Sequence, residues 1–116
     1  MEEIEVMRNG ELPLIFEGEE LGFATSFRDG KDRWFEVMIY RTASGRYVVN
    51  GIGRSLLPGE EDRSWAIICE KPAEVIEALK RTSPDGVSYL SVTATHALLE
   101  AARLDHDLGL AARMRI

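Results

Sequence analysis

The sequence predicts an α+β protein, in which an antiparallel sheet of about five or six strands, arranged as a hairpin meander, is followed by two C-terminal helices packed on it. Short runs of alternating apolar residues separated by turns fill positions 4–70, and apolar residues at helical spacing appear only after Pro72. A length of 116 residues suits one hydrophobic core. We therefore expect residues 1–116 to form a single domain.

The first two strands are expected at residues 4–8 and 12–16, joined by Asn9-Gly10. Asn-Gly favours the two positive φ angles of a tight type I′ hairpin turn. Pro13 has no N–H to give to a neighbouring strand, so an edge position is expected for this part of the chain. A second turn is expected at Glu17-Gly18-Glu19-Glu20.

Four further strands are expected at residues 21–27, 34–41, 46–52 and 64–70. The strand at 34–41 is predicted to be central because both of its faces are apolar. One face carries Phe35, Val37 and Ile39, and the other carries Trp34, Met38 and Tyr40.

Two helices of about three turns do not obviously cover both faces of such a sheet. Either the sheet curls strongly and covers its own second face, or a homodimer buries Trp34, Met38 or Tyr40 across a two-fold axis. The chain is therefore expected to be a monomer or a homodimer. Its acidic N-terminal edge disfavours pairing of strands between two copies through residues 1–20.

Two glycines, Gly51 and Gly53, lie on the same face of their strand as Tyr47 and Val49. Missing side chains at these positions relieve packing, or allow a bulge or the close approach of a helix or a ligand.

The first helix is expected over residues 72–82, because Pro72 suits its first position and Val75, Ile76 and Leu79 repeat at helical spacing. Ser83-Pro84-Asp85-Gly86 must end it. Ser91 or Thr93 is the expected cap of a second helix. Its apolar face carries Ala94, Ala97, Leu98, Ala101, Leu104 and Leu108, and residues 111–116 either extend it or fray.

The net charge of −6 is concentrated at the N-terminus. Residues 1–20 hold seven carboxylates against Arg8, whereas residues 28–54 have six basic and three acidic side chains, a local charge of +3. Charges of this kind protect edge strands from aggregation, or they form a docking surface for a basic partner.

No catalytic or cofactor-binding motif is present, so we expect neither an enzyme nor a bound cofactor or metal. His96 is predicted on an exposed helix face, where Glu100 alone does not complete a metal site. His106 is predicted near a helix C-terminus, with a capping role. The single cysteine, Cys69, follows Ile67-Ile68 and is expected to be a small buried apolar residue.

One cysteine and an acidic N-terminus, in place of the basic start of a signal peptide, favour a cytoplasmic location and no membrane association.

Several short motifs give the chain a family resemblance: Arg33-Trp34, Tyr40-Arg41-Thr42, Gly45-Arg46-Tyr47-Val48-Val49, Gly53-Arg54-Ser55 and Pro58-Gly59-Glu60. In these segments the sequence resembles small uncharacterised proteins of actinobacteria and their mobile elements, loosely over residues 14–105. This resemblance implies no activity. The paired strands are also similar to the Trp-Gly-Arg nucleic-acid-binding domain, although Ile52 stands where the tryptophan of that signature would be.

Three functions follow from these observations. The first is a non-catalytic interaction module, such as a phage or mobile-element accessory protein that inhibits or regulates a host nucleic-acid-binding protein through Glu11, Glu17, Glu19 and Glu20. The second is direct binding of nucleic acid or ligand by Arg33, Trp34, Tyr40, Arg46 and Arg54, with Arg41 beside them. The third is an undetected enzyme or small-molecule binder, with a site at Gly51 and Gly53 beside Trp34, Tyr40 and Tyr47.

Overall fold

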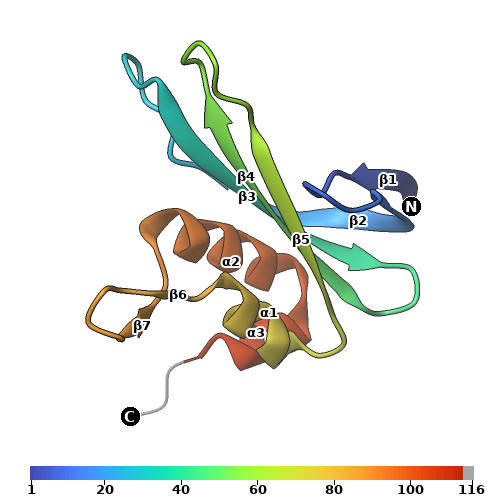
Figure 1. Cartoon of the computed structure of the whole chain (residues 1–116). Helices are drawn as coiled ribbons and strands as arrows, with labels where there is room; N and C mark the ends of the chain where they lie inside the picture. The colour runs from blue at the N-terminus through green and yellow to red at the C-terminus, as the bar shows by residue number, and fades with distance from the viewer. Residues whose placement is uncertain (114–116) are drawn as a thin grey trace.

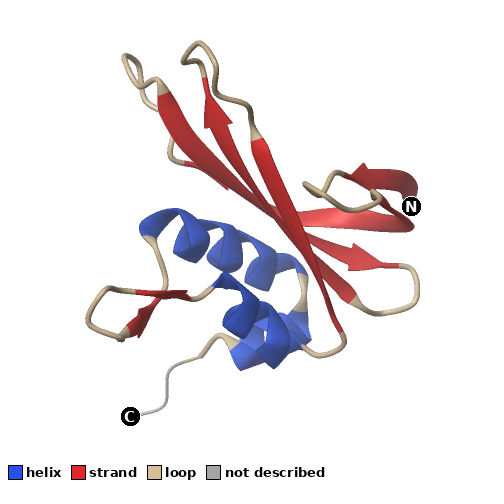
Figure 2. Ribbon diagram, in the orientation of Figure 1, coloured by secondary structure: helices blue, strands red, loops and turns tan. Residues whose placement is uncertain are grey.

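The structure is a computed structural model that describes residues 1–113. One antiparallel sheet contains five strands in chain order: β1 (Glu2–Val6), β2 (Leu14–Thr25), β3 (Arg33–Thr42), β4 (Tyr47–Ser55) and β5 (Arg63–Cys69) (Figure 1). Helices α1 (Pro72–Leu79), α2 (Val92–Leu104) and α3 (His106–Ala111) gather on one side of it (Figure 2). A small hairpin of β6 (Arg81–Thr82) and β7 (Ser88–Tyr89) connects α1 to α2. The predicted α+β class and meander are confirmed.

The main core lies between the helices and the middle of the sheet. Its sheet side is formed by the apolar face of β3 predicted from alternation, together with the matching residues of β4 and β5. The buried core residues are Leu21, Val37, Ile39, Tyr47, Val49, Cys69, Val75, Leu79, Ala94, Ala97, Leu98, Ala101 and Leu108. Cys69 is buried, as predicted.

One long strand, β2, replaces the strands predicted at residues 12–16 and 21–27, so the turn predicted between them at Glu17–Glu20 is wrong. The register with β3 shifts between Glu20 and Gly22, which marks a β-bulge at Leu21. Leu21 is buried in the core, and a Cβ on Gly22 would overlap the backbone of Ala97 in α2. The shape of this segment is therefore determined by packing on the helix and not by a local turn preference.

A turn forms at Asn9-Gly10, where the Glu11 N–H donates to the Arg8 carbonyl at 3.3 Å, but the predicted tight type I′ hairpin connection there is wrong. The ladder of β1 and β2 ends at Val6 and Leu14, so the connection is a loop of seven residues, 7–13. Gly10 has a φ of 74°, but no other residue type has a positive φ in the described chain, which excludes a type I′ turn with Asn9. Instead, the N–H of Asn9 donates to the Ser64 carbonyl at 2.9 Å, and its side-chain oxygen accepts from the Ser64 N–H.

The second face of the sheet is covered by the sheet itself. The ribbon of β1 and β2 curls away from the helices, and the contact of Asn9 with Ser64 ties its loop to β5 at the opposite edge, which gives a curled half-barrel (Figure 1). Val6, Met38 and Val48 are buried inside it. Of the two predicted solutions for this face, the fold adopts curling, and Met38 is not available as the centre of a face-to-face dimer.

The helical region differs from its prediction at two points. Helix α1 ends at Leu79, and the residues after it form β6, the Ser83–Gly86 turn and β7. Ser91 caps α2 by accepting from the Ala94 N–H at 3.1 Å, as predicted.

The predicted second helix is divided at Asp105 into α2 and α3. Leu104, predicted on the apolar face, is therefore 66% exposed. His106 begins α3, so the predicted role at a helix C-terminus is wrong. Residues 111–116 were predicted to extend the last helix or to fray. Helix α3 ends at Ala111, and positions 114–116 lie outside the described residues.

Candidate functional site

Six carboxylates lie together on the ribbon of β1 and β2. The register places Glu3 opposite Glu17 and Glu5 opposite Ile15, so that these four side chains share the outer face of the ribbon. Glu19 continues the same face along β2. Glu2 and Glu20 border a hollow that also includes Glu3, Glu19 and Tyr40. We call Glu2, Glu3, Glu5, Glu17, Glu19 and Glu20 the acidic ribbon.

No member of the acidic ribbon forms an ion pair with a basic group among residues 1–113. Like charges directly opposite each other, as in Glu3 and Glu17, destabilise a strand pair. Partial burial, and after it the charge of Glu100 in α2, raises the pKa of Glu20. Burial and the nearby Glu20 also raise the pKa of Tyr40. This surface therefore carries uncompensated negative charge.

Glu11 does not belong to the acidic ribbon, although the sequence grouped it with Glu17, Glu19 and Glu20. It lies in the loop beyond the Val6 and Leu14 end of the ladder, where it is 3.6 Å from Arg8. Of the other three, Glu17 and Glu19 share the outer face with Glu3 and Glu5, whereas Glu20 alternates to the other face and meets Glu2 at the hollow. Cross-strand register, which sequence analysis placed incorrectly at Asn9-Gly10, determines this grouping.

Four arginines of the basic segment, in contrast, are engaged within the molecule. Arg33 forms a two-pronged pair with Glu60, Arg41 is 3.2 Å from Asp105, and Arg54 contacts both Glu36 and Asp62 at 3.0 Å. Arg33, and then the Ser55 hydroxyl, lower the pKa of Glu60 to about 2.

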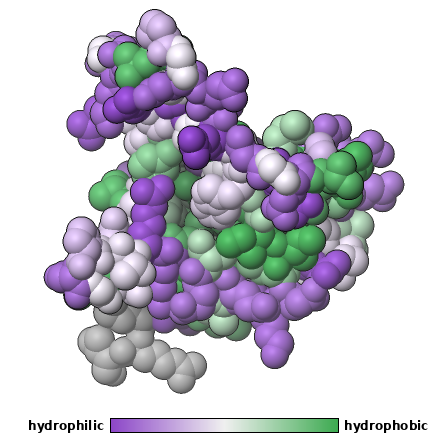
Figure 3. Space-filling view, in the orientation of Figure 1, coloured by the Kyte–Doolittle hydropathy of each residue, from purple (hydrophilic) through white to green (hydrophobic). Residues whose placement is uncertain are grey.

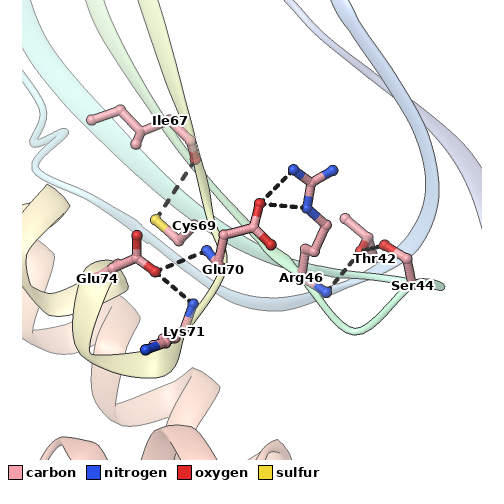
Figure 4. Close-up of polar contacts among 8 residues, drawn as sticks. All are labelled: Thr42, Ser44, Arg46, Ile67, Cys69, Glu70, Lys71 and Glu74. Carbon is pink, nitrogen blue, oxygen red and sulfur yellow. Dashed lines mark hydrogen bonds and ion pairs between the residues drawn. The ribbon is translucent and has the colours of Figure 1, made fainter.

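Arg46 is paired with Glu70, which follows β5 (Figure 4). Figure 4 also shows Glu74 of α1 accepting hydrogen bonds from the backbone N–H groups of Glu70 and Lys71, at 3.1 and 2.8 Å. The pair thus links the β3–β4 turn to the start of α1. Cys69 lies next to it, and burial raises the pKa of its thiol to about 11, so the thiol stays neutral near pH 7.

The five residues predicted as a nucleic-acid or ligand surface do not form one continuous surface. Arg33 and Arg54 lie at one end of the β3–β4 hairpin, while Arg46 lies at the other, about 25 Å away along an extended strand. Trp34 is half-buried, with its ring edge-to-face with Phe27 at 4.7 Å and its N–H directed to Glu36 at 3.4 Å. Tyr40 packs in the same manner against Phe16 at 5.6 Å.

A pocket of about 280 Å³ opens beside the acidic ribbon, at one end of the half-barrel. Its apolar walls include Leu14, Phe16, Val48 and Ile68. The polar residues that line it are Glu17, Thr42, Ser44 and Arg46, and Arg46 is paired with Glu70. Figure 3 shows exposed apolar surface surrounded by polar side chains in the region of β5, where Trp65, Ile67 and Ile68 are 39%, 43% and 44% exposed.

Asp105 was missed as a structural centre by the sequence analysis. It is buried, accepts from the Tyr47 hydroxyl at 3.0 Å and from the Leu108 N–H at 2.9 Å, and is paired with Arg41. Burial, followed by the hydrogen bond to Asp105, raises the pKa of Tyr47 to about 12. The sequence signal was the pattern Asp105-x-x-Leu108 at a helix start, which is that of an N-cap.

His96 and His106 are both exposed. Among residues 1–113, no three His, Cys, Asp or Glu side chains are arranged as they would be around a metal ion.

No known protein family, curated protein or solved structure matches this chain. None of the helices in the described part of the chain is long and apolar enough to cross a bilayer.

Proposed function

We propose that the protein is a non-catalytic interaction module that binds a basic protein through the acidic ribbon. The observation that carries this proposal is the contrast between the two charged segments. The carboxylates of β1 and β2 have no cationic partner among residues 1–113, whereas Arg33, Arg41, Arg46 and Arg54 are all paired within the molecule. Negative charge is therefore presented outward without compensation, whereas most of the positive charge of the basic segment is paired; its exceptions among the described residues, Arg28 and Lys31, lie in the exposed loop before β3.

The adjoining pocket supports the proposal that the acidic ribbon binds a protein and does not merely attract dissolved cations. Interfaces combine a polar rim with a buried apolar anchor, and an anchor side chain of the partner fits between Phe16, Val48 and Ile68. A lysine or arginine beside that anchor would reach Glu17, which lines the pocket. The partner surface would thus be basic with an apolar residue at its centre.

The partner class that we propose is a host protein with a basic nucleic-acid-binding groove. Occupation of that groove by the acidic ribbon would exclude the nucleic acid, because both compete for the same cations. In this role the protein would be an accessory factor that inhibits or regulates such a host protein. Paired arginines on β3 and β4 make direct binding of nucleic acid by this chain the weaker alternative.

The test is a pull-down from host lysate at about 0.05 and 0.5 M salt. The distance over which exposed charges attract one another is several-fold shorter at the higher salt concentration. The bait is compared with a Glu3→Lys, Glu17→Lys, Glu19→Lys variant. Its matched control carries lysines at Asp29, Glu61 and Asp107, which are exposed and have no ion pair among the described residues.

We expect the wild type and the control to retain basic partners at low salt and to release them at high salt. The amount of partner recovered at low salt should be at least tenfold lower with the ribbon variant. A partner that the ribbon variant retains as well as the wild type does would contradict the proposal.

A further inference from the structure

The helix-facing side of β4 carries two glycines in alternate positions, Gly51 and Gly53. Across β3, β4 and β5, one row consists of Phe35, Gly53 and Arg63, and the next consists of Val37, Gly51 and Trp65. Residues directly opposite one another share a face. Each glycine is therefore flanked by larger side chains that project to the same side.

Trp65 fills the space at Gly51 and leaves that at Gly53 open. A Cβ on Gly51 would overlap the indole ring, so the ring lies across this glycine. A Cβ on Gly53 would meet no atom nearer than the Arg63 carbonyl oxygen at 3.8 Å. Gly51 thus allows a side chain to pack, and Gly53 forms the floor of a pocket of about 200 Å³.

This pocket is not the one predicted from the sequence. Gly51 and Gly53 were expected beside Trp34, Tyr40 and Tyr47, but Trp34 and Tyr40 project from the other face of β3, opposite Arg54 and Val48. Tyr47 is buried against Asp105. The walls are instead Phe35 and Trp65, with Arg63 and Arg81.

Two arginines border the pocket without a carboxylate partner among residues 1–113. The guanidinium carbon of Arg81 lies 4.5 Å from the centre of the Phe35 ring. Arg81 is the first residue of β6, two positions after the end of α1, and in Figure 1 β3 and β4 project past the helices. Glu36 also borders the pocket, but its carboxylate is bonded to Arg54 at 3.0 Å.

We propose that this pocket binds a small aromatic carboxylate, with the ring between Phe35 and Trp65 and the carboxylate held by Arg63 and Arg81. A cavity of about 150 Å³ holds benzene, so the volume here suits one ring with a carboxylate and is too small for a nucleotide. Guanidinium groups bind carboxylates through paired, charge-assisted hydrogen bonds, and aromatic walls favour an aromatic ring. This site is independent of the acidic ribbon and of the function proposed for it.

The test is an NMR titration of the ¹⁵N-labelled full chain with sodium benzoate, followed at the Trp65 indole N–H and the Gly53 amide. We expect saturable shifts with a Kd on the order of 0.1 to 1 mM, in the range for a ligand of this size. A Cβ at Gly53 meets no close atom, so Gly53→Leu should place its side chain in the pocket and abolish the shifts. The double variant Arg63→Gln, Arg81→Gln should weaken binding at least tenfold.

The matched control is Arg28→Gln, Arg103→Gln, which removes two exposed arginines that have no ion pair among the described residues and do not border the pocket. It should leave the Kd unchanged, and benzylamine should cause no saturable shift. Absence of a saturable benzoate shift up to about 10 mM, roughly tenfold above the expected range, would overturn the proposal. So would benzoate binding that survives both Gly53→Leu and the double arginine variant.

Discussion

Asp105 is the only charged residue buried by the fold among residues 1–113, and three of its contacts join separate parts of the chain. It ends α2, caps α3 through the Leu108 N–H, and binds Tyr47 and Arg41 on the sheet. A buried carboxylate is tolerated only when it is paired and hydrogen-bonded. These contacts therefore fix the angle of the two helices on the sheet.

Tyr47→Phe should lower the free energy of unfolding by about 1 to 2 kcal/mol at pH 7, because Asp105 loses one buried donor and keeps Arg41 and Leu108. Urea unfolding measures the difference, with Tyr89→Phe as the exposed control. An equal effect of both substitutions would contradict this role.

The pH dependence of the same residue provides a second prediction. Folding raises the pKa of Tyr47 to about 12, above the usual value near 10. The stability that this provides is complete below pH 10 and is lost as the pH rises toward 12. Wild-type stability should therefore fall more steeply than that of Tyr47→Phe between pH 10 and 12, as measured by urea unfolding over this range; parallel curves would show that the phenol is not the group responsible.

At the scale of the element, the bulge in β2 joins the acidic ribbon to the helix-covered part of the sheet. Leu21 is directed into the core there, and Gly22 lies against the backbone of α2 at Ala97. A strand without the extra residue would place the side chains after it on the opposite faces.

Gly22→Ala should lower stability by about 1 to 3 kcal/mol, because its Cβ overlaps a helix backbone that cannot rotate away. Gly53→Ala, in the same sheet but with free space, should change stability by less than about 0.5 kcal/mol. Chemical denaturation compares the two. Equal destabilisation would mean that strand glycines matter here only for backbone entropy.

The elements most accurately predicted from the sequence are those in which local preference and tertiary packing agree. Alternation in β3 identified its core face, and Ser91 was correctly identified as a candidate cap of α2. Asn9-Gly10 and Glu17–Glu20 have strong turn preferences, but the contact with Ser64 and the pairing with β1 and β3 determine their conformations. The acidic ribbon was recognised in composition, whereas the pairing of the arginines with Glu60 and Glu70, far along the chain, required the fold.

At the scale of the whole molecule, unpaired and paired carboxylates lie in different places. The carboxylates of the acidic ribbon repel one another, and Glu20 is also repelled by Glu100. Carboxylates outside the ribbon, such as Glu60, Glu70 and Asp62, are paired with arginines of the basic segment. Such an arrangement reduces stability and favours association with an oppositely charged partner.

Glu20→Gln should therefore stabilise the protein at pH 7. Folding raises the pKa of Glu20, so its contribution to stability is complete below its usual value of 4.5 and is lost as the pH rises through the raised pKa. Glutamine remains neutral, and the advantage of the variant should disappear on acidification toward pH 4.5. Thermal unfolding at both pH values measures this, with Glu61→Gln as an exposed control; a stabilisation that is the same at both would contradict the electrostatic cause.

The bond between Asn9 and Ser64 also has a kinetic consequence. These residues lie at the two ends of a meander in which each strand pairs with the one before it, so they meet only when β2, β3, β4 and β5 are aligned. Direct closure of so long a loop from the unfolded chain is entropically costly, whereas closure across a formed sheet is not. We therefore expect the apolar interior at Val6 and Val48, which is buried in the folded protein, to close late in folding, after the helix-covered core, and to open first.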